Sequence, residues 1–308
     1  MGFGITFSNV LLTLAYILPG FLLCKVKKAS AEHLTSMSAF LIYACSPCMI
    51  ISAFLNFEFS VEQLTNMGLF FASSLVLQAA FMLVLFALFR KKYADAKYRI
   101  LTIASVMGNV GFFGMPLVKA LLPDNPEALC YSSIYVISMN ILVFTVGIFC
   151  LTGDKRSMTL KAAIFNPSMA GLAIGLPVYI FGIGSFIPDI ASNAISLLGS
   201  MSTPLCMAIL GIRLATVSLP KLFSRPMIYL ISLGKLVLFP LFCYGVVYFL
   251  PLPWSLKASL LILSATPCAS IIFNMAELHK SETELAANCV LVTTLLSCLT
   301  LPLITMIL

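Results

Sequence analysis

The chain has 308 residues, of which 61% are hydrophobic and only 9% are charged. Soluble domains carry roughly 25% charged residues, so this chain has too little polar surface to cover a water-soluble globule of its size. The composition predicts an all-α integral membrane protein in a lipid bilayer and excludes soluble enzymes. The net charge of +7 is spread in short clusters between apolar runs, so we expect no nucleic-acid partner.

Ten apolar stretches are long enough to cross a bilayer as helices. A spanning helix needs about 20 mainly apolar residues to cross a hydrocarbon core of about 30 Å. We place these stretches at residues 4–24, 33–55, 65–89, 99–122, 127–152, 162–181, 188–212, 226–250, 255–278 and 283–307. The first stretch is not typical of a cleavable signal, because the basic residues follow its apolar run instead of preceding it.

The basic residues between these stretches are concentrated in every second loop. They are Lys25, Lys27 and Lys28, then Arg90, Lys91, Lys92, Lys97 and Arg99, then Lys155, Arg156 and Lys161, then Arg213, Lys221 and Arg225, and finally Lys280. The intervening loops carry only Lys119 and Lys257. Because cytoplasmic loops hold an excess of Lys and Arg, this pattern predicts that both termini lie outside, in what we expect to be a bacterial plasma membrane.

The sequence offers little material for a metal site or for catalysis. The ten cysteines lie almost entirely in apolar stretches, where cysteine behaves as a small apolar residue. Cys45 and Cys48 form a CxxC pair, but no second pair follows at metal-binding spacing. The acid pair or zinc-type cluster that an intramembrane hydrolase needs is missing too. We therefore expect no metal, no cofactor and no enzymatic activity.

Prolines within the stretches recur at nearly the same offsets in the two halves of the chain. They are Pro19, Pro47 and Pro116 in the first half, and Pro177, Pro204 and Pro267 in the second. The match predicts a duplication, with residues 1–152 as one five-helix repeat and residues 153–308 as the other. Because five is an odd number, the second repeat is inverted in the membrane, an arrangement typical of secondary transporters.

The fourth and ninth stretches carry residues that interrupt a helix. In the fourth, Gly108, Asn109, Gly111, Gly114 and Pro116 fall within nine residues. Proline removes a backbone donor and glycine tolerates unwound geometry. The ninth carries a similar polar run around Pro267. Two such breaks bring the amino ends of two half-helices together near the bilayer centre, where their N–H groups and partial positive charge favour an anion.

One basic residue, Lys235, lies inside a predicted span. At 1.5 Å per residue it is about 15 Å from the end of the helix near Arg225, close to the midplane. Either its ammonium group snorkels or is capped by carbonyls, or it faces a polar path and governs the charge of what passes. Gln78 has the matching place in the first repeat. Glu277 lies near a predicted cytoplasmic helix end, where a solvated carboxylate is the simpler interpretation.

Four motifs follow one another along the whole chain in a specific order. They are residues 109–120, with an asparagine before a Gly-x-Pro-Leu run, the Asn166–Pro167 pair, residues 203–215, and residues 265–277. Together they resemble the auxin efflux carrier family of membrane transporters, which includes plant auxin exporters and bacterial permeases for small organic acids.

The resemblance implies ten helices in which the unwound parts of the fourth and ninth cross, as in bile-acid symporters and NhaA-type exchangers. It implies a scaffold of helices one, two, six and seven, often dimeric, against which helices three to five and eight to ten move. It also implies that Asn109 helps to hold a substrate carboxylate, with Pro116 and Pro267 at the crossing. The residues from Cys268 to Ile271 depart from the family, because they lack the glycine or asparagine often seen there.

These observations lead to one functional hypothesis. We expect a secondary transporter that moves a small organic anion, a mono- or dicarboxylate of auxin-like or malate-like type, by elevator-type alternating access. The candidate substrate-binding residues are Gly108, Asn109, Gly111, Gly114, Pro116, Thr266, Pro267, Cys268, Ser270 and Asn274. Lys235, Gln78 and Glu277 are candidates for charge balance or coupling. Thr266, Ser270 and Asn274 also suit hydrogen bonds between helices.

Several features of this hypothesis stay open at this point. Coupling to Na+, coupling to H+ and facilitated diffusion are all compatible with the sequence. We expect a homodimer formed through the scaffold helices. The alternatives to an organic-anion transporter of this kind are a sodium-coupled symporter of the bile-acid type and a transporter-like sensor of a ligand.

Overall fold

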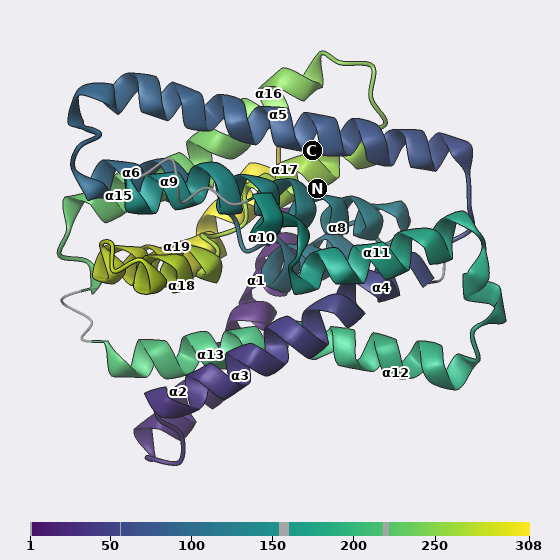
Figure 1. Ribbon diagram of the computed structural model, residues 1–308, viewed down its shortest axis with the longest axis horizontal. Helices are drawn as coiled ribbons and strands as arrows, with labels where there is room; N and C mark the ends of the chain where they lie inside the picture. Colours follow the sequence, from purple (N-terminus) through teal and green to yellow (C-terminus); the bar gives the residue numbers. More distant parts are fainter. Residues whose placement is uncertain (1, 56, 154–159, 218–221) are drawn as a thin grey trace.

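The computed structural model describes residues 2–55, 57–153, 160–217 and 222–308, and these residues form helices joined by short connections (Figure 1). The predicted all-α class is therefore confirmed for the described part of the chain. Three of the basic residues used for the topology, Lys155, Arg156 and Lys221, lie outside the described residues.

The described residues of the first half form nine α-helices and five short 3-10 or π-helical segments. In chain order they are α1 (Phe3–Ala15), α2 (Ile17–Lys25), η1 (Ala31–His33), α3 (Leu34–Phe40), η2 (Leu41–Cys45), α4 (Ser46–Leu55), α5 (Val61–Phe89), η3 (Arg90–Lys92), α6 (Ala96–Ala104), η4 (Val110–Gly114), α7 (Met115–Leu121), α8 (Glu127–Leu142), η5 (Val143–Gly147) and α9 (Ile148–Thr152). The segments η2, η4 and η5 are π-helical, a geometry frequent at functional sites.

The second half of the chain also consists of α-helices with short 3-10 or π-helical segments between them. Its elements are α10 (Leu160–Ile164), α11 (Pro167–Ile180), η7 (Ile183–Phe186), α12 (Asp189–Ser200), α13 (Ser202–Thr216), α15 (Pro226–Leu233), η8 (Gly234–Leu238), α16 (Phe239–Tyr248), α17 (Trp254–Ser264), α18 (Ser270–Leu278) and α19 (Thr283–Thr305). The start of α11 follows from its sequence, because the Asn166 side chain accepts a hydrogen bond from the Met169 N–H and Pro167 occupies the first turn.

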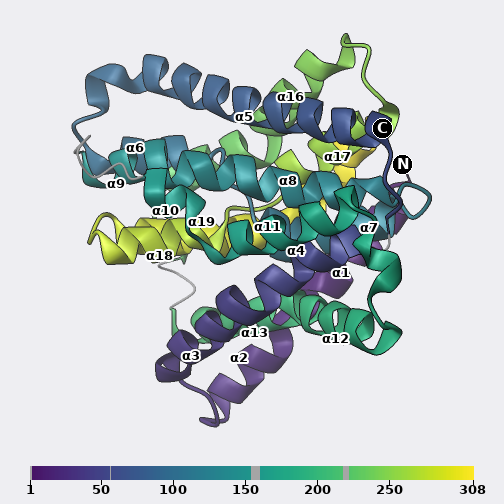
Figure 2. The ribbon, with the colours of Figure 1, turned by 45° about the vertical axis from the view of Figure 1, so that its right-hand side comes forward.

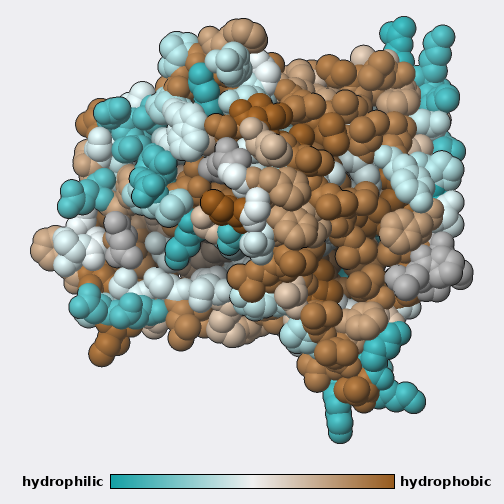
Figure 3. All heavy atoms as spheres, turned by 180° about the vertical axis from the view of Figure 1, so that it is seen from behind, coloured by the Kyte–Doolittle hydropathy of each residue, from teal (hydrophilic) through white to brown (hydrophobic). Residues whose placement is uncertain are grey.

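Seven helices in the described residues are long and apolar enough to cross a membrane. They are Phe3–Lys25, Ala31–Leu55, Val61–Lys92, Glu127–Thr152, Asp189–Thr216, Pro226–Tyr248 and Thr283–Thr305. Three shorter apolar helices, Val110–Leu121, Pro167–Ile180 and Trp254–Ser264, lie in the remaining predicted spans. Figure 3 shows a broad apolar surface with hydrophilic side chains toward its margins. These features support an integral membrane protein, while the count of ten crossings stays a prediction.

Two pairs of helices pack through glycines at very close range. Helix α2 lies along α13, and α4 lies along α11 (Figures 1 and 2). A Cβ added to Gly20 would collide with the carbonyl oxygen of Ala208, and one on Gly171 would lie 2.9 Å from the carbonyl oxygen of Pro47. Small residues let helix backbones approach where the bilayer removes the hydrophobic driving force between helices. The two pairs therefore form a tightly packed group.

The two ends of the chain lie near each other in both ribbon views (Figures 1 and 2). Helix α1 packs on α19, and the Thr305 hydroxyl donates to the Thr6 hydroxyl at 3.0 Å. An even number of membrane crossings places the termini on one side in this way. Which side that is remains the prediction made from the basic loops.

Candidate functional site

Two helices are interrupted, each by five residues. Helix α6 ends at Ala104 and η4 begins at Val110, while α17 ends at Ser264 and α18 begins at Ser270. Both interruptions fall within the spans where the sequence predicts them. The position of the first differs from the expectation, because the break comes before most of the glycine-rich run, whose later residues are helical.

The two interruptions cross and hydrogen-bond to each other. Gly108 and Cys268 form an isolated antiparallel bridge, and the Asn109 N–H donates to the carbonyl of Pro267 at 2.7 Å. A second backbone bond of 3.1 Å joins the same two segments. Each break therefore satisfies backbone groups of the other, as non-helical backbone in a bilayer protein requires.

Glycine is required on the first interrupted helix because its neighbours approach so closely. A Cβ on Gly108 would collide with the Thr266 hydroxyl and lie 3.0 Å from the Nζ of Lys235. A Cβ on Gly114 would lie 2.9 Å from the Cγ2 of Thr266 and 3.0 Å from the Cδ2 of Leu263. These contacts lock η4 and the end of α6 against the ninth span.

A cavity of about 470 Å³ lies beside this crossing, and we call it the crossing cavity. Its walls are mostly apolar, and its uncharged polar side chains include Asn109, Asn140, Asn166, Ser270 and Asn274. The volume is within the range of sites for small molecules, which combine apolar walls with a few polar groups. The arrangement suits a small amphipathic ligand.

Arg213 is the one charged side chain among the described residues that line the crossing cavity. Its Nη2 donates to the Oδ1 of Asn274 at 3.3 Å, and its guanidinium lies 3.9 Å from the ring centroid of Phe273. Its Nε is buried and has no hydrogen-bond partner in the described structure. A guanidinium presents several donors whose geometry matches a carboxylate, and within the described residues Arg213 keeps one of these donors unused.

Asn109 lies at the other end of the crossing cavity from Arg213. It is 4% exposed, and its Nδ2 lies 3.9 Å from the Sγ of Cys206 on α13. Thiol sulfur is a weak acceptor, so the amide keeps donor capacity for a ligand. Cys206 and Arg213 are seven residues apart on the same face of α13, which corresponds to about 10 Å along the helix. The two polar ends of the cavity are therefore about one small molecule apart.

The predicted site residues divide into two groups in the structure. Five of them line the crossing cavity: Gly108, Asn109, Gly111, Ser270 and Asn274. Four others pack at the crossing behind its wall: Gly114, Thr266, Pro267 and Cys268. Pro116 is not among the residues that line the crossing cavity, and it lies within the continuous helix Val110–Leu121.

A sequence model described as "Membrane transport protein" matches residues 5–161 and 154–305, nearly the whole chain. The chain belongs to this family, that of the auxin efflux carriers. The resemblance carried by its motifs is therefore confirmed, and with it the broad class of membrane transporter.

This auxin efflux carrier family member is similar to two archaeal proteins. It is 27% identical over 206 residues to an uncharacterized transporter of Methanothermobacter thermautotrophicus, covering 66% of each chain. It is 24% identical over 217 residues to the uncharacterized transporter MJ1031 of Methanocaldococcus jannaschii, covering 69% of each. The match to the first relative thus spans just under two thirds of that protein, and neither name states a substrate.

Lys235 of this transporter is fully buried and lies behind the wall of the crossing cavity. Its Nζ donates to the carbonyl oxygen of Ser264 at 2.7 Å and lies 4.9 Å from the ring centroid of Phe239. The sequence left two interpretations of Lys235, and the contact agrees with the one in which a backbone carbonyl caps the ammonium group. Its ammonium group still lies next to Gly108, which lines the cavity.

Neither of the other two coupling candidates lines the crossing cavity, although the carboxylate of Glu277 lies within electrostatic reach of Arg213. Gln78 is buried, and its Nε2 donates to the carbonyl of Ser74 and the hydroxyl of Ser138, both at 3.0 Å. Its Oε1 has no partner in the described structure. Glu277 is exposed on α18, in agreement with the solvated interpretation.

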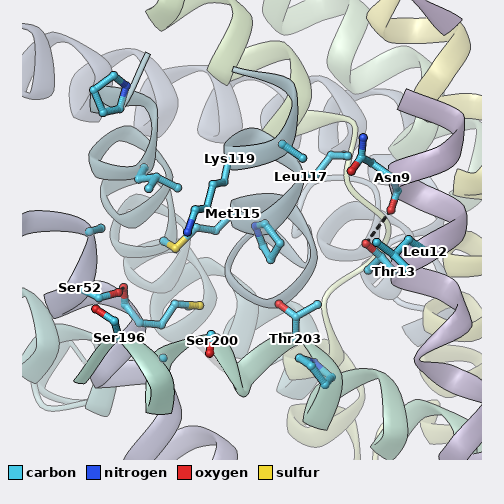
Figure 4. A pocket seen from close by; sticks show the side chains of 18 of the residues that line it. Asn9, Leu12, Thr13, Ser52, Met115, Leu117, Lys119, Ser196, Ser200 and Thr203 are labelled. Atoms are coloured by element: carbon cyan, nitrogen blue, oxygen red, sulfur yellow. Dashed lines mark hydrogen bonds between the residues drawn. The ribbon is translucent and has the colours of Figure 1, made fainter. Parts of the chain in front are cut away.

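A second cavity, of about 430 Å³, is lined by α1, α4, α7, α12 and α13. Figure 4 shows Lys119 of α7 reaching into it, with Ser52, Ser196, Ser200 and Thr203 along the opposite wall. Met49 lines both this cavity and the crossing cavity. The fourth span, which carries the first interruption, therefore extends from the crossing cavity to the second cavity.

Proposed function

We propose that this protein is a secondary transporter of a small organic anion, a mono- or dicarboxylate, which it moves by elevator-type alternating access at the helix crossing. The observation that carries the proposal is the charge of the crossing cavity. Arg213 gives it one fixed positive charge, and no Asp or Glu is among the described residues that line it. A site with that balance attracts anions and rejects cations.

The carboxylate is proposed to bind between Asn109 and Arg213. The Asn109 amide donates to one oxygen, and the guanidinium takes over the other once Arg213 releases Asn274. Gly111 and Ser270, near the starts of η4 and α18, line the same cavity, and the amino ends of helices add partial positive charge. The buried ammonium of Lys235 contributes a further positive potential from behind Gly108.

The apolar walls of the crossing cavity determine which kind of substrate fits beside the carboxylate-binding groups. Phe112, Met139 and Phe144 are among the side chains that line it, and they favour an organic anion over an inorganic one, because burying apolar surface contributes about 25 cal/mol per Å². A carboxylate with an apolar or aromatic body therefore matches the whole cavity better than a bare ion.

An elevator mechanism requires a fixed group of helices and a moving one. The tight pairs α2–α13 and α4–α11 are proposed as the scaffold, in two copies per homodimer, and the helices that carry the crossing are proposed to move against it. Both cavities lie between these groups, which supports the assignment. The pairing of the first helix with the seventh, and of the second with the sixth, is what two inverted five-helix repeats produce.

The coupling ion is a separate part of the proposal. Neither cavity is lined by an acidic side chain among the described residues, which removes the usual carboxylate for a proton exchanger. We therefore propose that the membrane potential suffices to drive the anion. The tests with and without a sodium gradient, and with and without a proton gradient, decide this point.

The proposal is tested by flux into proteoliposomes of radiolabelled carboxylates that include acetate, malate and indole-3-acetate. We expect uptake of at least one of them above that of protein-free liposomes, and its loss in Asn109→Ala. The control is Asn193→Ala, an exposed site on α12 outside both cavities, which should transport normally. Binding of a carboxylate without any flux would instead identify a ligand sensor, and full transport by a well-folded Asn109→Ala protein would refute the proposed site.

A further inference from the structure

The second cavity has the same charge balance as the crossing cavity. Lys119 is its one charged lining residue, and no Asp or Glu is among the described residues around it. The two cavities are thus separate hollows, each with a single basic side chain. The sequence predicted Lys119 only as a charge in a loop.

Lys119 has no assigned partner in the described parts of the chain. Lys119 is exposed, its side chain reaches into the cavity (Figure 4), and no hydrogen bond, ion pair or ring contact within the described parts involves its ammonium group. The hydroxyls of Ser196 and Thr203 face the same space (Figure 4) and likewise have no hydrogen-bond acceptor assigned within the described structure. An ammonium with three donors and two hydroxyls thus converge on one hollow of about 430 Å³.

The wall between the two cavities is thin. Met49 of α4 lines both of them, and its Cε would lie 3.1 Å from a Cβ placed on Gly111. The thioether end of Met49 therefore rests on the bare backbone of η4. Methionine is flexible and adapts to irregular space, so a small shift of η4 relative to α4 moves this contact.

The same elements line the two cavities in succession. On α13, Thr203 faces the second cavity and Arg213 the crossing cavity. On the fourth span, Asn109 faces the crossing cavity and Lys119 the second. The two hollows therefore follow each other along the same elements, with Met49 between them.

We infer that the second cavity is a second binding station for the transported carboxylate, with Lys119 as its charged ligand and Met49 as the barrier between the two stations. The inference rests on the proposed function, because it uses the same class of anion. Once the crossing has moved against the scaffold, the anion leaves Arg213 of α13 and passes to Lys119 of α7 on its way out of the protein.

The test measures the rate at which an amine-reactive acylating reagent modifies Lys119 in proteoliposomes, by mass spectrometry, in the presence of each carboxylate of the flux panel. We expect any carboxylate that is transported to slow acylation of Lys119 at least fivefold. The control is Lys257, a partly exposed lysine outside both cavities whose Nζ donates to the carbonyl of Tyr248 and whose acylation should not change. Transport of a carboxylate without protection of Lys119 overturns the inference.

A second measurement separates the station from the proposed function. Lys119→Gln should raise the KM for transport about tenfold, the worth of one charge-assisted hydrogen bond in a partly solvated site, with kcat little changed, and Lys119→Arg should restore the KM to within twofold of wild type. An unchanged KM in well-folded Lys119→Gln contradicts the inference. Protection of Lys119 without transport of any carboxylate supports the station and refutes the proposed function.

Discussion

Replacing Arg213 with glutamine tests whether the crossing cavity selects for negative charge. The substitution removes the guanidinium and leaves a shorter, neutral amide, while glutamine forms helices about as well as arginine does. Arg213 is half-buried near the end of α13 and makes one hydrogen bond, of 3.3 Å, with Asn274. We therefore expect Arg213→Gln to fold and to lose affinity for the substrate.

The size of the loss follows from the contacts of Arg213. A hydrogen bond to a charged group contributes about 1.5–3 kcal/mol net, and each 1.36 kcal/mol is a factor of ten in an equilibrium constant. Binding of a carboxylate requires the guanidinium to release Asn274 and partly leave the ring of Phe273. The free energy lost in breaking these contacts offsets part of the gain from the new hydrogen bond. The lower half of the range applies, so the KM should rise about 13- to 45-fold.

Uptake of the transported carboxylate into proteoliposomes, measured over a range of concentrations, gives the KM of Arg213→Gln. The matched control is Lys25→Gln, since Lys25 is an exposed basic residue that donates to the carbonyl of Ala215 at the same end of α13. The control should keep the wild-type KM. Equal KM values for Arg213→Gln and the wild type would refute the role given to the guanidinium.

Three further substitutions follow from the structure. Lys235→Met should leave the protein folded, because it removes a buried charge that has no charged partner among the described residues. It should weaken substrate binding about 30-fold, since two unit charges separated by about 8 Å interact by about 2 kcal/mol at an effective dielectric of 20. Titration calorimetry measures this, and unchanged affinity would show that the ammonium group does not contribute to binding. Gly114→Ala should lower the free energy of unfolding by about 1–3 kcal/mol, because the new methyl group overpacks the site. Adding Thr266→Ser should recover part of that stability, because it removes the Cγ2 atom that the new methyl group meets. If thermal unfolding shows no recovery in the double variant, the contact between Gly114 and Thr266 is contradicted. Gly211→Ala should lower the Tm, because its Cβ would lie 2.8 Å from a backbone nitrogen of α2, whereas Gly245→Ala, with no atom within 4 Å, should not.

The site residues that were predictable from the sequence are those with a local signal. Asn109, Ser270 and Asn274 are polar residues within apolar spans, so their presence there already indicated a site, and all three line the crossing cavity. The breaks in the fourth and ninth spans were predictable from glycine and proline. Their exact limits were not, because a π-helical turn keeps Gly111 and Gly114 helical, and the pattern of glycines does not distinguish such a turn from an unwound segment.

The basic residues of the two cavities were missed for a different reason. Arg213 and Lys119 lie near the ends of predicted spans, where charge ordinarily faces water and reports topology. Arg213 borders the crossing cavity, where it reaches Asn274 of α18, and Lys119, although exposed, borders the second cavity beside α1. Lys235 shows the opposite case, since its depth was predictable and its contact with the Ser264 carbonyl was not.

The central claim, a carboxylate held between Asn109 and Arg213 at the helix crossing, is tested most directly by an electron cryomicroscopy structure with a transported carboxylate bound. The account predicts density for the ligand in the crossing cavity, with carboxylate oxygens within about 3 Å of the Asn109 Nδ2 and of the guanidinium of Arg213. Ligand density outside the crossing cavity and the second cavity, in a protein that transports the same compound, would contradict it.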